Sequence, residues 1–530
     1  MHRFRLTDAI AGCAYGGKLL LSGNEAIALG AWEAGLAVAT GYPGTPSTEI
    51  LEFLCGAEGV KSQWSVNEKV AYEVAFGAAV GGARSLYASK HVGLNVAMDP
   101  LMTSVYAGVN GGMVVVVADD PGLHSSQNEQ DTRWVAPYAK APMIEPSSPS
   151  EAYAFVKEAF AISERFDTPV LFRITTRVAH SEESVKIKGR SVGPKIRPFK
   201  KDISKYVMIP DNSYRRHVGI EKRLLRMAAF ANTTKLNRIE PGSDKLGFIV
   251  SSAAYQYVKE SYPDASVLKL GFSWPFCDEK ITGFAKSVRK LVVVEELDPL
   301  IEEHVRALGI KARSKHNSDR IGELKPEHIS DIVSGKPKTE VRQKTNIPQL
   351  CSACPHGFVF TVMSQLDLTV TGDIGCYTLG ALPPYKTMHT NLCMGAGITM
   401  HEGMRLAHDD NKTVGIIGDS TFVHSGITGL INTVYNKGRG LIIILDNSIT
   451  AMTGGQGHPG SGIDICGKPT ETLSLEAICR ASGVKNVDVV RPQDQDRLRE
   501  LILRGLSDAE LSVIIARSPC VLFTKREKVL

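Results

Sequence analysis

Short runs of apolar residues alternate along the chain with stretches of helical pattern. Runs without polar alternation predict buried strands of a parallel sheet, because helices cover both faces of such a sheet. Strands are expected at residues 37–40, 113–118, 169–174, 246–251, 291–295, 414–417, 441–445 and 513–516, and helices at 24–34 and 69–82. Strands that alternate with helices predict right-handed β–α–β units and an α/β fold.

Three α/β blocks, joined by two polar connections, fit a chain of 530 residues. We expect domains at 1–185, 245–310 and 346–530, with linkers at 186–244 and 311–345. The first linker is rich in lysine and arginine and has weak periodicity, so we interpret it as a basic crossover linker with a solvated face.

Composition narrows the classes of function. The chain is 43% hydrophobic and 22% charged, with a net charge of +5, which gives no reason to expect nucleic acid or a membrane as partner. Its longest apolar runs are far shorter than the ~18–20 residues of a membrane span. We therefore expect a cytoplasmic protein.

The strongest local motif places polar side chains at the ends of two expected strands. Asp419 and Asn447 each follow an apolar run, and carboxyl strand ends are where α/β sheets bind ligands. Their side-chain oxygens, with the carbonyl of Ile449, suit Mg²⁺ that is also held by phosphate. Gly418 permits close approach of the backbone, and the helix start at Ser420 offers N–H groups to an anion. Alone, the motif fits a plain strand-to-helix turn equally well.

Four cysteines have a suggestive spacing. Cys351 and Cys354 form a Cys-x-x-Cys pair, Cys376 follows in a Gly-Cys-Tyr sequence, and Cys520 lies near the end of the sequence. A zinc site, a dithiol redox pair and a [4Fe–4S] cluster are the three alternatives.

These motifs together resemble a known family. Residues 418–420 with Asn447 resemble the diphosphate motif of thiamine-dependent enzymes, with Ser420 in place of a glycine. Thr453 and Gly454 begin a segment similar to the one that follows this motif in 2-oxoacid:ferredoxin oxidoreductases. The strings at 22–28, 124–130, 293–298, 372–380 and 418–427 resemble the α subunits of indolepyruvate ferredoxin oxidoreductases over nearly the whole chain.

The resemblance implies three doubly wound parallel-sheet domains of the thiamine-diphosphate-binding, transketolase-like type. The pyrimidine-binding domain would be 1–185, a small transketolase C-terminal-like domain 245–310, and the diphosphate-binding domain with the cluster site 346–530. The cofactor-binding positions would be Gly418, Asp419, Ser420, Asn447, Ile449, Thr453, Gly454, Cys393 and Met394. Cys393 is also expected to be a small buried side chain. The resemblance favours [4Fe–4S] over zinc at Cys351, Cys354, Cys376 and Cys520.

Catalytic residues are assigned in the same way. Glu68 is expected to hydrogen-bond the aminopyrimidine of the cofactor, and Glu73 is its competitor. Thr45 lies in a loop that the family places against the substrate. His424 is a candidate proton shuttle, and Arg133 is either the anchor of the substrate carboxylate or an exposed surface arginine.

The implied reaction is oxidative decarboxylation of arylpyruvates such as indolepyruvate or phenylpyruvate, with thiamine diphosphate and Mg²⁺ as cofactors and coenzyme A as acyl acceptor. Electrons would pass through one [4Fe–4S] cluster, because no further cysteine run follows Cys520 in the printed sequence. The expected partners are a smaller γ-type (β) subunit in a hetero-oligomer and an electron acceptor, ferredoxin or another. A non-oxidative thiamine-dependent decarboxylase or carboligase and a non-catalytic assembly subunit are the alternatives.

Overall fold

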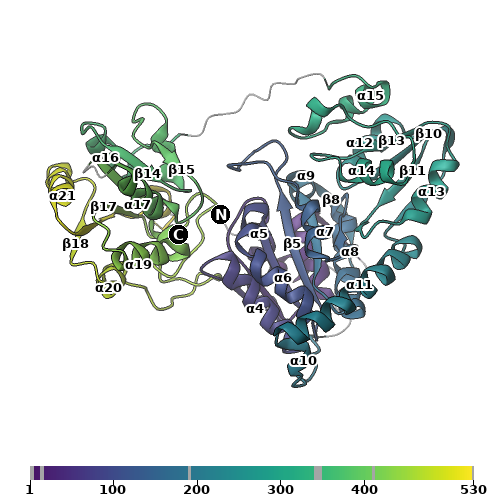
Figure 1. The fold of residues 1–530 in the computed structure, drawn as a ribbon, viewed down its shortest axis with the longest axis horizontal. Coiled ribbons are helices and arrows are strands. Elements are labelled where there is room, and N and C mark those ends of the chain that lie inside the picture. Colours follow the sequence, from purple (N-terminus) through teal and green to yellow (C-terminus); the bar gives the residue numbers. More distant parts are fainter. Residues whose placement is uncertain (1–4, 12–16, 189–192, 339–348, 409–411, 528–530) are drawn as a thin grey trace. The chain divides into compact units, whose positions relative to one another are not determined.

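The computed structural model describes residues 5–11, 17–188, 193–338, 349–408 and 412–527, and the chain divides into two compact units (Figure 1). The first unit is Met1–Arg342 and the second is Gln343–Leu530. The first contains a seven-stranded sheet, a four-stranded sheet and a two-stranded ribbon, and the second contains a six-stranded sheet. The predicted α/β class is confirmed. Of the three larger sheets, two lie in the first unit and one lies in the second.

The seven-stranded sheet is parallel except at one edge. Its strands, in spatial order, are β12 (Phe272–Trp274), β6 (Met143–Ile144), β7 (Val170–Thr175), β5 (Met113–Asp119), β4 (Ser85–Lys90), β2 (Val38–Gly41) and β3 (Lys61–Trp64). Every residue of β4, β5 and β7 is buried, as the unbroken apolar runs of β5 and β7 predict. The edge strand β12 pairs antiparallel with β6.

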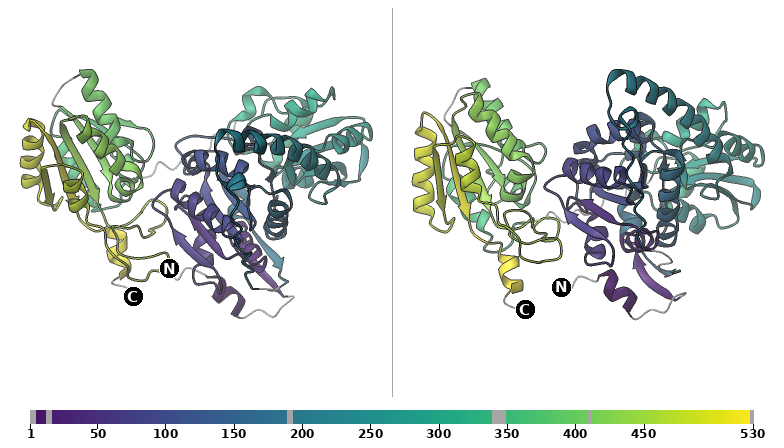
Figure 2. Two further views of the ribbon diagram at one scale, coloured as in Figure 1. Left: turned by 60° about the horizontal axis from the view of Figure 1, so that its bottom comes forward. Right: turned by 90° about the horizontal axis from the view of Figure 1, so that it is seen from below.

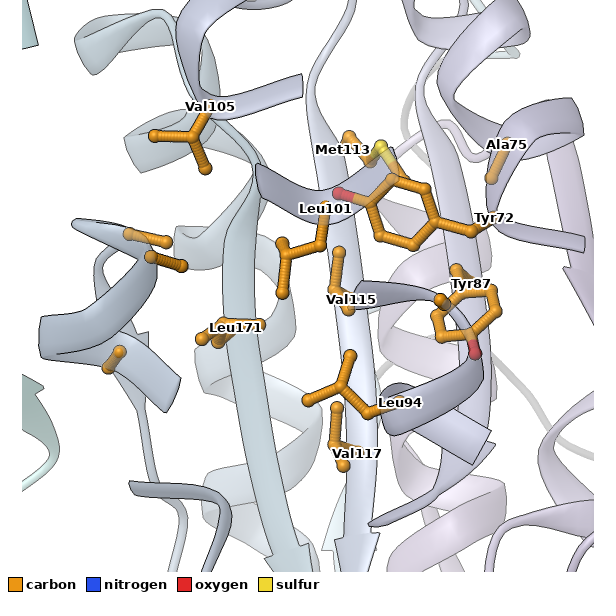
Figure 3. Close-up of a cluster of buried hydrophobic side chains, with 14 of the residues drawn as sticks. Tyr72, Ala75, Tyr87, Leu94, Leu101, Val105, Met113, Val115, Val117 and Leu171 are labelled. Atoms are coloured by element: carbon orange, nitrogen blue, oxygen red, sulfur yellow. The ribbon is translucent and has the colours of Figure 1, made fainter. Parts of the chain in front are cut away.

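Helices cover both faces of this sheet. The helix α8 (Pro149–Phe166) packs with α2 (Gly23–Glu33) on one face. On the other, α4 (Glu68–Val80), α6 (Met98–Ala107) and α7 (Val135–Ala139) enclose a core that Figure 3 shows in part. Its labelled side chains, among them Tyr72, Leu101 and Val115, come from helices and strands far apart in the sequence.

The four-stranded sheet contains β13 (Leu291–Val294), β10 (Ser243–Ser251), β11 (Ala265–Leu270) and β9 (Arg238–Glu240), in that order. The first three strands are parallel, and β9 is antiparallel to β11. Within the segment expected to be a linker, the structure forms α11 (Pro210–Thr233), a helix of 24 residues. Its Ile220 joins the core of the seven-stranded sheet, and its buried Arg223 donates to the carbonyls of Val105 and Asp167.

The six-stranded sheet is entirely parallel. Its strands, in order, are β15 (Thr390–Asn391), β14 (Thr369–Gly372), β16 (Thr413–Gly418), β17 (Gly440–Asp446), β19 (Leu511–Arg517) and β18 (Asn486–Val490). Helices lie on both of its faces (Figure 2): α16 (Pro355–Met363) packs with α21 (Gln495–Ser507), and α17 (Ala396–His408) packs with α19 (Ile427–Tyr435).

The remaining elements are α1 (Leu6–Ala11), β1 (Lys18–Ser22), α3 (Thr48–Leu54), α5 (His91–Val96), η1 (Thr132–Trp134), α9 (Thr176–His180), β8 (Glu182–Lys186), α10 (Ile203–Tyr206), α12 (Ala254–Ser261), α13 (Asp278–Lys286), α14 (Leu300–Ala307), η2 (Asn317–Arg320), α15 (Pro326–Ser334), η3 (Cys376–Ala381), α18 (Asp419–Thr421), η4 (Phe422–Gly426), α20 (Leu475–Ala481) and α22 (Val521–Glu527). Among the residues that the structure describes, no helix is long and apolar enough to cross a membrane.

Candidate active site

The six-stranded sheet has a reversal of strand order between β14 and β16. From β14 the chain first adds β15 on one side and then returns to add β16 on the other. Parallel α/β sheets bind ligands at the carboxyl ends of strands that flank such a point. Asp373 directly follows β14, and Asp419 directly follows β16. Both carboxyl groups are buried, so the edge that the sequence predicts does carry Asp419.

Asp419 is held in place by three hydrogen bonds. Its Oδ1 accepts from the N–H of Ser420 at 2.8 Å, and its Oδ2 accepts from the N–H of Ser448 at 2.7 Å. Nε2 of His458 lies 3.2 Å from the same Oδ2. Burial alone raises the pKa of Asp419, but these bonds outweigh it and lower the pKa below its ordinary value. The carboxylate is therefore ionised and oriented.

Asn447 lies at the end of the neighbouring strand, β17, and contacts a residue of the Cys-x-x-Cys segment. Its Nδ2 is 3.2 Å from Nε2 of His356, and its Oδ1 accepts from the N–H of Ile449 at 3.2 Å. Burial lowers the pKa of His356 to about 4, so its ring is neutral near pH 7 and can accept from the amide. Sequence analysis missed His356, although it lies two residues after Cys354.

A polar cavity of about 350 Å³ lies beside Asp419. Asp446, His458 and Arg517 are among its lining residues. Nε of Arg517 donates to Asp446 at 2.6 Å, and burial together with the charge of Asp419 raises the pKa of Asp446. Two carboxyl groups beside one cavity suit a cation better than an anion.

The segment after Asn447 turns tightly. Thr453 donates its hydroxyl to Oε1 of Gln456 at 2.5 Å, and Gly454 has a φ of +116°, a conformation that favours glycine. The side chain of Ile449 is buried. These residues and Ser420 thus lie on two consecutive strand-end segments, after β16 and after β17.

Asp373 organises a second group that sequence analysis missed. Its Oδ2 accepts from the N–H of Gly395 at 2.8 Å, and its Oδ1 accepts from the hydroxyl of Tyr377. Burial raises the pKa of Asp373 to about 7, although these bonds and the nearby charge of His424 oppose the rise. The sequence does contain a signal for Asp373, since a Gly-Asp pair stands at the end of β14 just as Gly418 and Asp419 stand at the end of β16.

His424 and Met394 meet in this group through a serine. Nδ1 of buried His424 is 2.9 Å from Oγ of Ser425, which donates to the carbonyl of Met394 at 2.8 Å. Cys393 is exposed, so the expectation that it is buried is wrong. It lies just after β15, the strand at one edge of the sheet, which pairs on one side only, with β14, among the described residues.

The four cysteines of the predicted cluster lie near one another. Burial, together with the neighbouring thiols of Cys354, Cys520 and Cys351, raises the pKa of Cys376 to about 12. The N–H of Cys354 donates to the carbonyl of Cys351 at 3.0 Å, and that of Cys520 donates to the carbonyl of Asn447 at 3.1 Å. Backbone hydrogen bonds therefore join Cys520 to the segment that carries Asn447 and Cys354 to Cys351.

In the part of the chain that the structure describes, no three histidine, cysteine, aspartate or glutamate side chains are grouped tightly enough to hold one metal ion. Four thiolates around one zinc ion would bring their sulfur atoms within ~3.8 Å of each other, as Zn–S bonds of ~2.3 Å require. The cysteines are neighbours without forming such a compact group.

Glu68, in the first unit, begins α4 directly after its N-cap residue Asn67. Its side chain is buried and lies on Gly93, where an added Cβ would come within 2.6 Å of Oε1 of Glu68. The competitor Glu73 is 45% exposed and pairs with Lys69. Glu68, unlike Glu73, is therefore enclosed. Its side chain fits there because residue 93 is a glycine and has no Cβ to occupy the same space.

The loop that carries Thr45 follows β2 and is fixed by its own hydrogen bonds. The hydroxyl of Ser47 donates to the carbonyl of Gly44 at 2.9 Å, and Nδ2 of Asn24 donates to that of Pro46 at 2.7 Å. Thr45 itself is half-buried.

Arg133 is enclosed by carboxylates. Its guanidinium is 1% exposed and bonds Asp131 at 2.5 Å and Glu295 at 2.6 Å. It also donates to the carbonyls of Glu296 and Asp298. The expectation of an exposed surface arginine is wrong, because all three nitrogens are buried in these contacts. Anchoring a substrate would require breaking them, and Arg133 is therefore left out of the function proposed below.

Comparison with known proteins agrees with this arrangement. Residues 373–516 match the family model of the C-terminal thiamine-pyrophosphate-binding domain of thiamine pyrophosphate enzymes. Residues 29–232 match the model of the thiamine-diphosphate-binding part of pyruvate flavodoxin/ferredoxin oxidoreductases. Domains that bind thiamine diphosphate are thus the class that the fold and the strand-end residues define.

The most informative relatives extend over almost the whole chain. Indolepyruvate oxidoreductase subunit IorA of Methanothermobacter thermautotrophicus is 40% identical over 96% of this chain and 87% of its own. The IorA subunit of Archaeoglobus fulgidus is 37% identical over 97% and 88%. The chain therefore belongs to the family of the indolepyruvate oxidoreductase IorA subunits, which are 2-oxoacid oxidoreductases.

A solved structure shows a similar fold. The 2-oxoglutarate:ferredoxin oxidoreductase of Magnetococcus marinus, with 2-oxoglutarate, coenzyme A and succinyl-CoA bound, is 16% identical. It aligns with a TM-score of 0.52 over 60% of this chain and 65% of its own.

Proposed function

We propose that this chain is the catalytic subunit of an enzyme that oxidatively decarboxylates arylpyruvates, such as indolepyruvate and phenylpyruvate, to the aryl-acetyl thioester of coenzyme A. The observation that carries the proposal is the buried pair Asp419 and Asn447 at the ends of β16 and β17, together with the enclosed Glu68 of the first unit. The relatives that are indolepyruvate oxidoreductase subunits support an arylpyruvate substrate.

Asp419, Asn447 and the carbonyl of Ile449 would hold Mg²⁺, with the diphosphate of the cofactor supplying further oxygens. The donor set fits, since Asp419 is ionised and its oxygens point into the strand-end segment with Ser448. Gly418, Ser420, Thr453, Gly454, Cys393 and Met394 would complete the cofactor contacts. Bound thiamine diphosphate would supply a nucleophilic carbon and an electron sink for the decarboxylation of a 2-oxo acid.

The protein's own residues then handle protons and position. Glu68 would share a proton with the ring nitrogen of the aminopyrimidine, and its enclosed place excludes water from that bond. Thr45 would contact the substrate. His424, fixed by Ser425, would carry a proton to or from the reacting groups.

Cys351, Cys354, Cys376 and Cys520 would hold a [4Fe–4S] cluster that takes up the electrons one at a time. What supports this assignment is that the thiols of Cys354, Cys520 and Cys351 are near enough to Cys376 to raise its pKa. A smaller γ-type subunit, an external electron acceptor such as ferredoxin and coenzyme A complete the proposed cytoplasmic hetero-oligomer.

The test is an anaerobic purification with assays for iron, acid-labile sulfide and zinc, followed by electron paramagnetic resonance after addition of indolepyruvate. We expect about four irons and four sulfides per chain and a reduced-cluster signal only with substrate. Cys354→Ser should lose the cluster. Cys479→Ser is the matched control, because Cys479 is a buried free thiol of α20 whose neighbouring charges are Glu476 and Arg480.

Zinc or no metal, with carbon dioxide still released from indolepyruvate, would instead identify a non-oxidative decarboxylase. A chain that neither binds thiamine diphosphate nor releases carbon dioxide would contradict the proposal altogether.

A further inference from the structure

The seven-stranded sheet also has a reversal of strand order, and it lies between β2 and β4. From β2 the chain first adds β3 on one side and then returns to add β4 on the other. The loop with Thr45 follows β2, and Lys90 is the last residue of β4. Lys90 therefore occupies the place in the first unit that ligand-binding residues occupy in such sheets.

Lys90 lies between the two candidate catalytic positions of the first unit. On one side, a Cβ added to Gly44, next to Thr45, would come within 3.2 Å of Cβ of Lys90. On the other side, α5 begins directly after Lys90, and its Gly93 contacts Glu68. The Cβ of Lys90 thus lies against the loop with Thr45, and its backbone leads directly into the helix that contacts Glu68.

The charge of Lys90 is buried without a carboxylate in contact. The residue is 8% exposed, and its Nζ donates to the carbonyl of Ser125 at 2.6 Å and lies 3.5 Å from the hydroxyl of the same residue. No ion pair of Lys90 occurs among the described residues. Burial lowers the pKa of Lys90 to about 8, which leaves the ammonium group largely protonated at neutral pH.

The nearest acid is engaged elsewhere. Oδ2 of Asp120 accepts from the N–H of Ser125 at 2.9 Å and from the hydroxyl of Ser126 at 2.5 Å, and Oδ1 accepts from the hydroxyl of Thr176 at 2.7 Å. Asp120 thus orders the segment that contacts Lys90, while its own oxygens are satisfied by neutral donors.

His91 provides a second buried donor or acceptor at the same strand end. It is 1% exposed, and its Nε2 lies 3.3 Å from Oδ1 of Asn128. Its Nδ1 is buried and has no hydrogen-bond partner among the residues that the structure describes. A buried ammonium and a buried ring nitrogen, both incompletely satisfied, are costly unless a ligand pairs with them.

We propose that Lys90, assisted by His91, binds the carboxylate of the 2-oxo acid substrate. This inference rests on the function proposed above and replaces Arg133, whose three guanidinium nitrogens each donate to protein carboxylates or carbonyls. A carboxylate paired with Nζ would orient the adjacent 2-oxo carbon beside Thr45 and Glu68. It would also make the site selective for 2-oxo acids over uncharged carbonyl compounds.

The test is steady-state kinetics of the purified complex with indolepyruvate, together with competitive inhibition by indole-3-propionate and by its uncharged primary amide. In Lys90→Met we expect KM to rise about 10- to 100-fold, the range for loss of a hydrogen bond to a charged group. The preference of the wild-type enzyme for the carboxylate inhibitor over the amide should disappear. Lys69→Met is the matched control, because Lys69 is an exposed lysine of the same unit paired with Glu73.

Lys90→Arg retains the charge and should retain the preference for the carboxylate, which a merely structural role would not predict. If Lys90→Met fails to fold, Lys90→Gln undergoes the same comparison. An unchanged KM, or an unchanged ratio of carboxylate to amide inhibition, would overturn the inference. Failure of the wild-type enzyme to act on indolepyruvate would instead overturn the proposed function and is a separate observation.

Discussion

Two buried cations of the first unit are compensated in different ways. Arg133 bonds the carboxylates of Asp131 and Glu295 and two carbonyls of the segment after β13. Lys90 is similarly enclosed, yet its partners are the carbonyl and hydroxyl of Ser125. One charge is neutralised by carboxylates in contact with it, whereas the other contacts only neutral oxygens and has its nearest carboxylate, Asp120, out of contact.

The difference separates a structural ion group from a binding group. Arg133 connects η1, near the seven-stranded sheet, to the end of a strand of the four-stranded sheet, so its ion pairs join two parts of one unit. A buried ion whose hydrogen bonds and ion pairs are complete adds nothing to the affinity for a ligand, since binding would first have to break those bonds. A buried ion without a counter-charge retains most of its desolvation cost until an anion binds.

The largest expected effect is on Arg133. Arg133→Met should lower the free energy of unfolding by about 3–5 kcal/mol, because it removes the guanidinium that the buried carboxylates of Asp131 and Glu295 share. Urea unfolding followed by circular dichroism measures the loss. Arg289→Met is the control, since Arg289 pairs with Asp244 and both side chains are more than half exposed, and should cost within about 1 kcal/mol. Equal losses in the two variants would contradict the comparison.

The same reasoning applies to a buried acid of the second unit, Asp373. Its contacts are neutral donors, and its pKa is raised to about 7. In the unfolded chain this carboxyl ionises near its ordinary value of 3.8, so wild-type stability should fall as the pH rises from about 4 to about 7. Asp373→Asn mimics the protonated form and should lack this fall.

We therefore expect the variant to exceed the wild type by roughly 2–4 kcal/mol at pH 8 and to match it near pH 4. Urea unfolding across this range measures the difference. Parallel curves for the two proteins would mean that Asp373 is ionised in the folded state and has a counter-charge.

For Lys90 the predicted effect on stability is smaller and of opposite sign to that for Arg133. Its folded-state pKa, about 8, lies below the ordinary 10.5, so the wild type carries a penalty that is complete below pH 8 and is lost as the pH rises toward 10.5. Lys90→Met should gain about 1–2 kcal/mol at pH 7 in the absence of substrate, after loss of the bond to Ser125. The gain should shrink above pH 8, and a loss of stability at pH 7 would show that the charge is compensated.

The sequence predicted those features of the fold and site that depend on residues close to each other along the chain. Eight strands, and with them Asp419 and Asn447 at strand ends, followed from apolar runs and the residue after each run, whereas β4, which has polar positions, was not predicted. Asp373 carries the same local signal, but only the later motif has the paired asparagine that drew attention to it. The environment of Arg133 could not be predicted, because Glu295 is 162 residues away in the sequence.

The position of Lys90 depends on strand order, which the pattern of apolar runs does not contain. Any of the predicted strands could have been the neighbour of β2, and only the return of the chain past β2 places Lys90 beside the loop with Thr45. The same holds for β12, whose antiparallel pairing with β6 joins residues more than a hundred positions apart. Local chemistry identifies candidate residues, and topology decides which of them meet.

The smallest expected effect distinguishes two glutamates of one helix. Glu73 is 45% exposed and forms an ion pair with Lys69 one turn earlier, so Glu73→Gln should change the free energy of unfolding by no more than about 0.5 kcal/mol. It should also leave the rate of indolepyruvate decarboxylation unchanged, whereas Glu68→Gln, at the enclosed position on Gly93, should lower that rate by at least 100-fold. Carbon dioxide release and urea unfolding measure the two quantities. A loss of activity in Glu73→Gln with Glu68→Gln unaffected would transfer the proton-sharing role to the exposed glutamate, and burial would then be no guide to the catalytic acid of this helix.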